Sequence, residues 1–164
     1  MSERAPESAL PSRRRDARER ALELLYEAEM KELRVADVLA DLPVAPDAYA
    51  VVIVTGVEDH REAHDAVIRS LLRIDWSFDR LPVLDRLLLR MGCEELAHQP
   101  KTPTAVVLDE TVELAKLFCA EESSKFVNGV LAKAANQLRP GSKTRTKSRP
   151  VSPAADSPDV VDVD

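Results

Sequence analysis

ELAKLFCAEESSKFVNGVL, residues 113–131, is the most informative segment of this chain. Apolar residues recur in it at three- and four-residue spacing on both sides of a polar break, which predicts two helices joined by a short turn. Ser123 or Ser124 is expected to cap the second helix. A helix start beside Lys125 could bind an anion such as phosphate, although the two glutamates before the serines would repel it. On these residues alone, a structural role is favoured.

The composition of the whole chain indicates an all-α protein. It has 164 residues, only four glycines and no sustained alternation of β-branched residues, so one domain without a sheet is expected. The two cysteines lie in helical apolar patterns and form no C-x-x-C pair, which predicts buried thiols in a reducing cytosol. No apolar run reaches the roughly 18 residues of a membrane span and no signal peptide is visible. We therefore expect a cytoplasmic protein without a membrane partner.

Turn signals divide the chain into helices and two tails. Residues 1–12 and 139–164 combine proline and serine with segregated charge and lack apolar periodicity, so both are expected to be disordered. Apolar periodicity predicts the following helices: about 13–33, 35–42, 48–59, 83–97, 105–120 and 123–138. Whether the third helix continues through residue 72 or is interrupted stays open. The segment WSFDRL, residues 76–81, predicts a packed turn held by Trp76 and Phe78.

Motifs for catalysis and metal binding are weak in this sequence. His60 and His64 have the i, i+4 spacing of two metal ligands, but Arg61 stands where a zinc protease motif needs its general base. We interpret both as surface histidines, and His98 has no evident partner. The chain has no nucleophile elbow, no phosphate-binding glycine loop and no S-x-x-K motif. We therefore expect no enzymatic activity, no cofactor and no metal.

Charge is distributed in blocks along the chain, whose net charge is −6. Residues 13–20 hold five arginines and two acids, residues 139–149 hold five basic residues and no acid, and the last nine residues hold four acids. A basic arm on an acidic body favours a polyanion and a basic protein as partners, whereas solvated helix faces are the alternative. Arginines can pair with phosphates and exposed aromatic rings can stack on bases. Tyr26 and Phe126 either provide such rings or belong to the core.

Three segments of the sequence, in this order, resemble the NusB transcription antitermination family. They are RRRDARERALELLYEAE (residues 13–29), DRLPVLDRLLLRMGCEEL (79–96) and TAVVLDETVELAKLFCAEESSKFVNGVLAKAA (104–135). The resemblance covers a helical RNA-binding domain, residues 13–138, and implies an all-α fold of about seven helices in two bundled subdomains. It implies a non-enzymatic function, the binding of boxA RNA in nascent ribosomal RNA transcripts together with NusE, a small-subunit ribosomal protein. The complex would act on RNA polymerase.

The resemblance also implies which side chains make contacts. The RNA-binding residues would be Arg14, Arg15, Arg18, Tyr26, Glu122, Ser123, Lys125 and Phe126. The NusE-binding residues would be Asp85, Arg86 and Arg90, which we expect to face outward from the helix over residues 83–97. Some members of the family form homodimers, so a second copy of the chain is a further candidate partner.

Three other functions stay open at the level of sequence. One is a helical protein-binding adaptor without specific RNA recognition. Another is an RNA-binding domain of the kind fused to ribosomal RNA cytosine methyltransferases, and the third is a DNA-binding helix-turn-helix protein.

Overall fold

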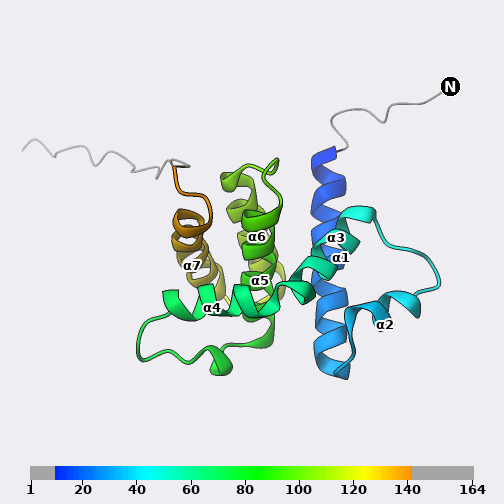
Figure 1. The fold of residues 1–164 in the computed structure, drawn as a ribbon, viewed down its shortest axis with the longest axis horizontal. Helices are drawn as coiled ribbons and strands as arrows, with labels where there is room; N and C mark the ends of the chain where they lie inside the picture. The colour runs from blue at the N-terminus through cyan, green and yellow to red at the C-terminus, as the bar shows by residue number, and fades with distance from the viewer. Residues whose placement is uncertain (1–9, 142–164) are drawn as a thin grey trace, which may run out of the picture.

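The fold consists of helices arranged around one central helix, α5 (Figure 1). The structure, a computed structural model, describes residues 10–141. The α-helices are α1 (Leu10–Lys31), α2 (Val35–Ala40), α3 (Ala48–Asp59), α4 (Arg61–Leu71), α5 (Val83–His98), α6 (Thr104–Phe118) and α7 (Ser123–Leu138). A 3-10 helix, η2 (Phe78–Arg80), precedes α5. No strand occurs within residues 10–141, and the all-α prediction is confirmed.

The helices form two groups that share α5. Helices α1, α2 and α3 pack together on one side, and α4, α6 and α7 lie on the other (Figure 1). Helix α5 packs against α1 and α3 as well as against α4, α6 and α7. This arrangement agrees with the two bundled subdomains that the resemblance implied.

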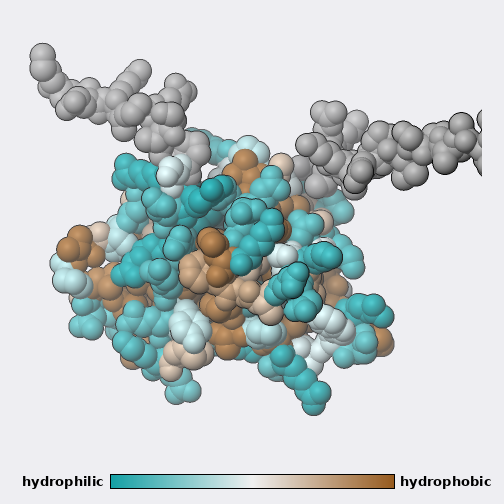
Figure 2. Space-filling view, turned by 180° about the vertical axis from the view of Figure 1, so that it is seen from behind, coloured by the Kyte–Doolittle hydropathy of each residue, from teal (hydrophilic) through white to brown (hydrophobic). Residues whose placement is uncertain are grey.

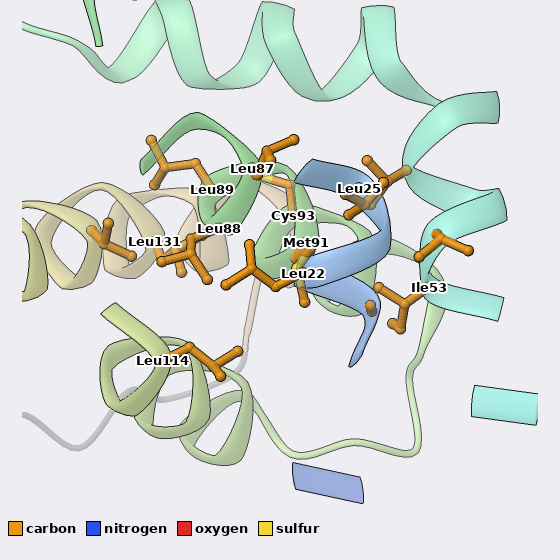
Figure 3. Packing of buried hydrophobic residues seen from close by; sticks show 14 of the residues in the cluster. Leu22, Leu25, Ile53, Leu87, Leu88, Leu89, Met91, Cys93, Leu114 and Leu131 are labelled. Atoms are coloured by element: carbon orange, nitrogen blue, oxygen red, sulfur yellow. The ribbon is translucent and has the colours of Figure 1, made fainter. Parts of the chain in front are cut away.

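The core is formed mainly by the side chains of α5 and the helices around it. Figure 3 shows Leu88 and Leu89 of α5 among leucines of α1, α6 and α7, and both are fully buried. A Cβ atom on Gly92 would lie 2.6 Å from the side chain of Leu131, so the glycine lets α5 and α7 approach closely. Each such leucine contributes about 1.5–3 kcal/mol through burial.

Helix boundaries agree with the predicted ones to within a few residues. Helix α1 begins at Leu10, three residues earlier than expected, and ends where Glu32 adopts a left-handed φ of 52°. The question about the third helix is settled, since His60 separates α3 from α4. Apart from residues 10–12 and 139–141, the two tails predicted to be disordered lie outside the described residues.

Arg139 fixes the end of α7 against the end of α5. Its guanidinium donates hydrogen bonds of 2.6–3.0 Å to four backbone carbonyl oxygens. These belong to Glu95, Leu96, Gln99 and Thr102. The last carbonyls of a helix lack partners within the helix, and a cation there is favoured by the helix dipole. Arg139 therefore belongs to the folded domain, one residue beyond the predicted boundary.

The surface of the molecule is mostly hydrophilic. On the face opposite to the one in Figure 1, apolar side chains gather near the middle and are framed by polar ones (Figure 2). Grouped apolar residues on a surface often mark an interaction site. Among the described helices, none has the length and hydrophobicity needed to cross a membrane.

Candidate nucleic-acid interface

A groove of about 300 Å³ lies where α1 meets the N-terminal ends of α5 and α7. Its lining includes Tyr26 of α1, Asp85 of α5 and Ser123 of α7. The ring of Tyr26 is exposed, with 43% of the residue accessible, so it can stack on a planar ligand. The structure thus brings two residues predicted to bind RNA together with one that was predicted to bind NusE.

Asp85 lies in the first turn of α5 and does not face outward as predicted, since only 4% of the residue is exposed. Its Oδ2 accepts a hydrogen bond of 2.9 Å from Ser123 Oγ. Its Oδ1 has no partner with hydrogen-bond geometry among residues 10–141. Two helix N-termini favour the negative charge at this place. Burial, followed by the nearby Asp85 carboxylate, raises the pKa of the Cys119 thiol to about 12.

The start of α7 differs from the prediction that a serine caps it. The N-cap is Glu122, which makes no capping hydrogen bond through its side chain. Ser123 Oγ is used by Asp85 instead, and Ser124 Oγ donates to the backbone oxygen of Glu121 at 3.3 Å. Ser123 is buried, so it orients the Asp85 carboxylate, whereas Glu122 is exposed beside it.

Arg14 and Arg15 are exposed on the first half of α1. The guanidinium of Arg14 lies 3.8 Å from the centre of the Tyr49 ring, a cation–π contact. Arg15 donates two hydrogen bonds of 2.9 Å to Glu110 of α6. Eleven residues separate Arg15 from Tyr26, close to three helical turns, so both lie on the same face of α1 about 16 Å apart.

Arg18 was predicted to be available to RNA, and the structure contradicts its expected exposure. The residue is 5% exposed, and its guanidinium donates to both carboxylate oxygens of Glu95 at 2.7 and 3.1 Å. The reason is its position on the helix, since Leu22 and Leu25 follow it at four and seven residues and belong to the same buried face. The apolar period of α1 was a signal for this burial that the charge of Arg18 concealed.

Lys125 and Phe126 line a second hollow, about 180 Å³, together with Trp76. The rings of Trp76 and Phe126 stack with their centres 4.9 Å apart. Phe126 is half-buried by this contact, and 46% of Trp76 remains exposed, so Trp76 does not pack into the turn as predicted. Phe78 does, at 6% exposure. Arg73 and Lys133 also line the hollow, which therefore combines aromatic rings with three cations.

Arg86 and Arg90 are less accessible than the prediction of a NusE-facing surface required. Arg90 is 3% exposed, and its guanidinium donates to both carboxylate oxygens of Asp65 on α4 at 2.7 and 3.0 Å. Arg86 is half-buried, with Nη2 3.7 Å from a carboxylate oxygen of Glu29 on α1. Arg90 therefore connects α5 with α4, and the outward orientation predicted for it is wrong.

The three histidines lie together, so His98 has the partner that the sequence did not reveal, and of the two predicted surface histidines His64 is buried. His64 is 2% exposed, and its Nε2 lies 2.6 Å from Oε2 of Glu94. His60 Nδ1 lies 3.0 Å from the same oxygen, and the ring of His98 stacks on that of His60 with centres 3.9 Å apart. Two helices that are distant in the sequence bring these side chains together.

Curated relatives of this chain share one description. "Transcription antitermination protein NusB" of Lysinibacillus sphaericus is 40% identical over 126 residues, which cover 76% of this chain and 98% of the relative. The protein of the same description from Kineococcus radiotolerans is 43% identical over 126 residues, covering 74% of this chain and 92% of the relative.

Solved structures similar to this fold have the same family name. NusB of T. maritima superposes with a TM-score of 0.71 at 29% identity, covering 77% of this chain and 93% of that chain. The chain matched in a crystal structure of the antitermination factors NusB and NusE in complex with dsRNA gives a TM-score of 0.65 at 29% identity, covering 77% and 98%. The NusB family model matches residues 15–136. On these similarities in sequence and fold, the chain belongs to the NusB family.

Proposed function

We propose that this protein is a transcription antitermination factor that binds boxA-type RNA of nascent ribosomal RNA transcripts together with NusE, within a complex on RNA polymerase. The observation that carries the proposal is the groove that joins Tyr26, Asp85 and Ser123. It is supported by the similar structure that contains NusB, NusE and dsRNA, and by relatives described as antitermination proteins. The proposed action is binding, with no covalent step.

The groove supplies contacts to bases. The exposed ring of Tyr26 offers a stacking surface, and such stacking contributes about 1–3 kcal/mol per base. Asp85 Oδ1 is buried next to the groove and has no hydrogen-bond partner from within residues 10–141, so it would accept a hydrogen bond from a base amino group, such as N4 of cytosine, when the groove opens around the base. We therefore assign Asp85 to RNA rather than to NusE.

Cations on both sides of the groove supply contacts to phosphates. Arg15 lies on the same face of α1 as Tyr26, and a phosphate would replace Glu110 as its partner. Lys125 is exposed beside the stacked rings of Trp76 and Phe126. Cations placed with aromatic rings in this way suit single-stranded RNA, because they bind its backbone and its bases together.

NusE would add affinity through simultaneous binding. The chain has 29 acidic and 23 basic residues, which favours a basic protein partner at a surface away from the arginines. When RNA contacts both proteins, the second contact is intramolecular and has a high effective concentration. Arg86 is the one member of the predicted NusE set that is half-buried rather than buried, and its contact with NusE stays a prediction.

Titration of a labelled single-stranded boxA RNA, followed by fluorescence anisotropy with and without NusE, tests the proposal. Tyr26→Ala should weaken RNA binding about tenfold or more through lost stacking. Lys125→Ala should weaken it less and should lower the slope of log K against log salt by about 1. Arg34→Ala is the matched control, since it removes a charge from an exposed residue in a different groove.

RNA affinities of Tyr26→Ala and Lys125→Ala that equal those of the wild type and the Arg34→Ala control would contradict the proposed surface. If the protein also bound NusE equally well with and without RNA, and RNA equally weakly with and without NusE, it would be a protein-binding adaptor instead. Circular dichroism of each variant ensures that a loss of binding is not a loss of fold.

A further inference from the structure

All three histidines of the chain meet at one place, the corner between α3 and α4 where it faces α5. With Glu94 they form a set of four side chains, each of which offers one potential metal-ligand atom. These atoms all lie within 4.8 Å of one another. Since the chain has three histidines in total, no other histidine can take part in a competing site.

The geometry follows from two pairs at i, i+4 spacing. His60 and His64 are one pair at the start of α4, and Glu94 and His98 are the other at the end of α5. Residues four apart share a helix face, so each helix presents two ligands toward the other. A Cβ atom on Gly56 of α3 would overlap the Glu94 carboxylate, so the glycine provides the room that this carboxylate occupies.

We propose that His60, His64, Glu94 and His98 bind a Zn²⁺ ion, each with one donor atom. Imidazole nitrogen and carboxylate oxygen are common zinc ligands, with bonds of about 2.0–2.2 Å and tetrahedral geometry, which places donor atoms roughly 3.4 Å apart. The distances from Glu94 Oε2 are 2.6 Å to His64 Nε2 and 3.0 Å to His60 Nδ1. A tetrahedral set requires that the stacked rings of His60 and His98 turn, so that one nitrogen of each points at the ion, and the exposed His98 ring has the freedom to do so.

The burial of the four residues suits a site with an entrance and a floor. His64 and Glu94 are buried, His60 is half-buried and His98 is exposed. The ion would enter past the two outer rings and take the place of the hydrogen bonds that His60 and His64 form with Glu94, and each neutral imidazole would carry its proton on the ring nitrogen that does not bind the metal. The buried carboxylate, which now has only imidazoles as partners, would gain a full positive charge beside it.

A metal here would fasten the α3–α4 corner to the C-terminal half of α5. Glu94 lies nine residues beyond Asp85, about 14 Å along the helix, so the ion would not touch the groove proposed for RNA. Its effect is therefore on stability. A ligand that binds only the folded state raises the melting temperature as its concentration increases.

The test uses the full chain without a polyhistidine tag, because a tag would bind the metal. Zn²⁺ is titrated in competition with a chromophoric chelator, and thermal unfolding is measured with and without Zn²⁺. We expect one Zn²⁺ per chain and a melting temperature that rises with the Zn²⁺ concentration. Co²⁺ in the same site should give the strong visible absorption of a four-coordinate ion.

His98→Gln is the decisive variant, since His98 is exposed and its loss should leave the fold intact. It should lower Zn²⁺ affinity at least tenfold and remove the strong Co²⁺ absorption, with unchanged circular dichroism. Glu62→Gln, which removes an exposed carboxylate from α4 two residues before His64, should change neither. Wild-type protein that binds no Zn²⁺ at a concentration of about 0.1 mM, well above the dissociation constants of structural zinc sites, would overturn the proposal. An unchanged Zn²⁺ affinity in His98→Gln would overturn it as well.

Discussion

The two ends of α5 both bury charged side chains, but those side chains are paired differently. From the middle of the helix toward its C-terminal end, Arg90 and Glu95 each form two hydrogen bonds with an oppositely charged partner. At the N-terminal end, Asp85 has a neutral hydroxyl on one oxygen, and its other oxygen is buried next to the groove without a hydrogen-bond partner from residues 10–141. A buried polar atom without a partner costs stability unless something satisfies it. A buried charged side chain whose hydrogen bonds are complete therefore has a structural role, and one that lacks a partner beside a groove indicates a ligand site.

The first and largest expected effect concerns the Arg18–Glu95 pair. Arg18→Ala would leave the Glu95 carboxylate charged and buried without its partner, so we expect a loss of about 3–5 kcal/mol in the free energy of unfolding. Urea unfolding followed by circular dichroism measures this loss. RNA affinity of the fraction that stays folded should be unchanged, because Arg18 is not on the surface.

The control for this prediction replaces both partners. Arg18→Met combined with Glu95→Leu removes both charges at similar volume, which is often neutral or stabilising for a buried pair. It should recover most of the stability lost in Arg18→Ala. If Arg18→Ala were as stable as the wild type, the Arg18–Glu95 pair would not stabilise the fold.

The sequence was sufficient for the helices because their apolar periods are long and their ends carry turn signals. It was insufficient for the buried charges, since a charged residue such as Arg18 is placed on the surface by default and its partner is 77 positions away. The same limit applies to the histidines. The i, i+4 spacing of His60 and His64 was visible, but that Glu94 and His98 face them depends on how α4 packs on α5.

The candidate site was predicted only in part, because some of its contacts depend on how helices that are distant in the sequence pack together. Tyr26 was named through the family resemblance, since its spacing alone left open whether the ring is exposed or in the core, and the structure places it in the groove. Asp85 was named for another partner, since its spacing on α5 suggested an outward direction that the contact with Ser123 reverses. Trp76 was expected to hold a packed turn with Phe78, and the exposed stack that it forms with Phe126 depends on a contact across 50 positions.

The second prediction concerns Asp85, whose charge should matter more for RNA than for the fold. In Asp85→Asn the amide oxygen can still accept from Ser123, and only the favourable charge near two helix starts is lost, so stability should change by about 1 kcal/mol or less. RNA binding should weaken about tenfold, because an amide nitrogen cannot accept the hydrogen bond proposed for Oδ1. Urea unfolding and anisotropy titration measure the two effects.

An opposite result for Asp85→Asn would contradict the difference in role between the buried charges at the two ends of α5. A large loss of stability with unchanged RNA affinity would place Asp85 with the architectural charges. Tyr26→Ala provides the reference, since it should weaken RNA binding while the exposed ring leaves little packing to lose.

The smallest effect is expected from Arg15 and Glu110, the exposed counterpart of the Arg18–Glu95 pair. The hydrogen bonds from Arg15 hold the pKa of Glu110 below its ordinary value. The carboxyl of the unfolded chain titrates near pH 4.3, so the pair stabilises the fold above about that pH. This contribution should disappear as the pH falls through the lower folded pKa. In Glu110→Gln, unfolding free energy should therefore fall less between roughly pH 5 and 3 than in the wild type. Arg15→Ala should reduce the pH dependence of the unfolding free energy similarly, and the double variant should reduce it no further than either single variant. An unchanged pH dependence in both single variants would show that the exposed pair does not contribute to stability.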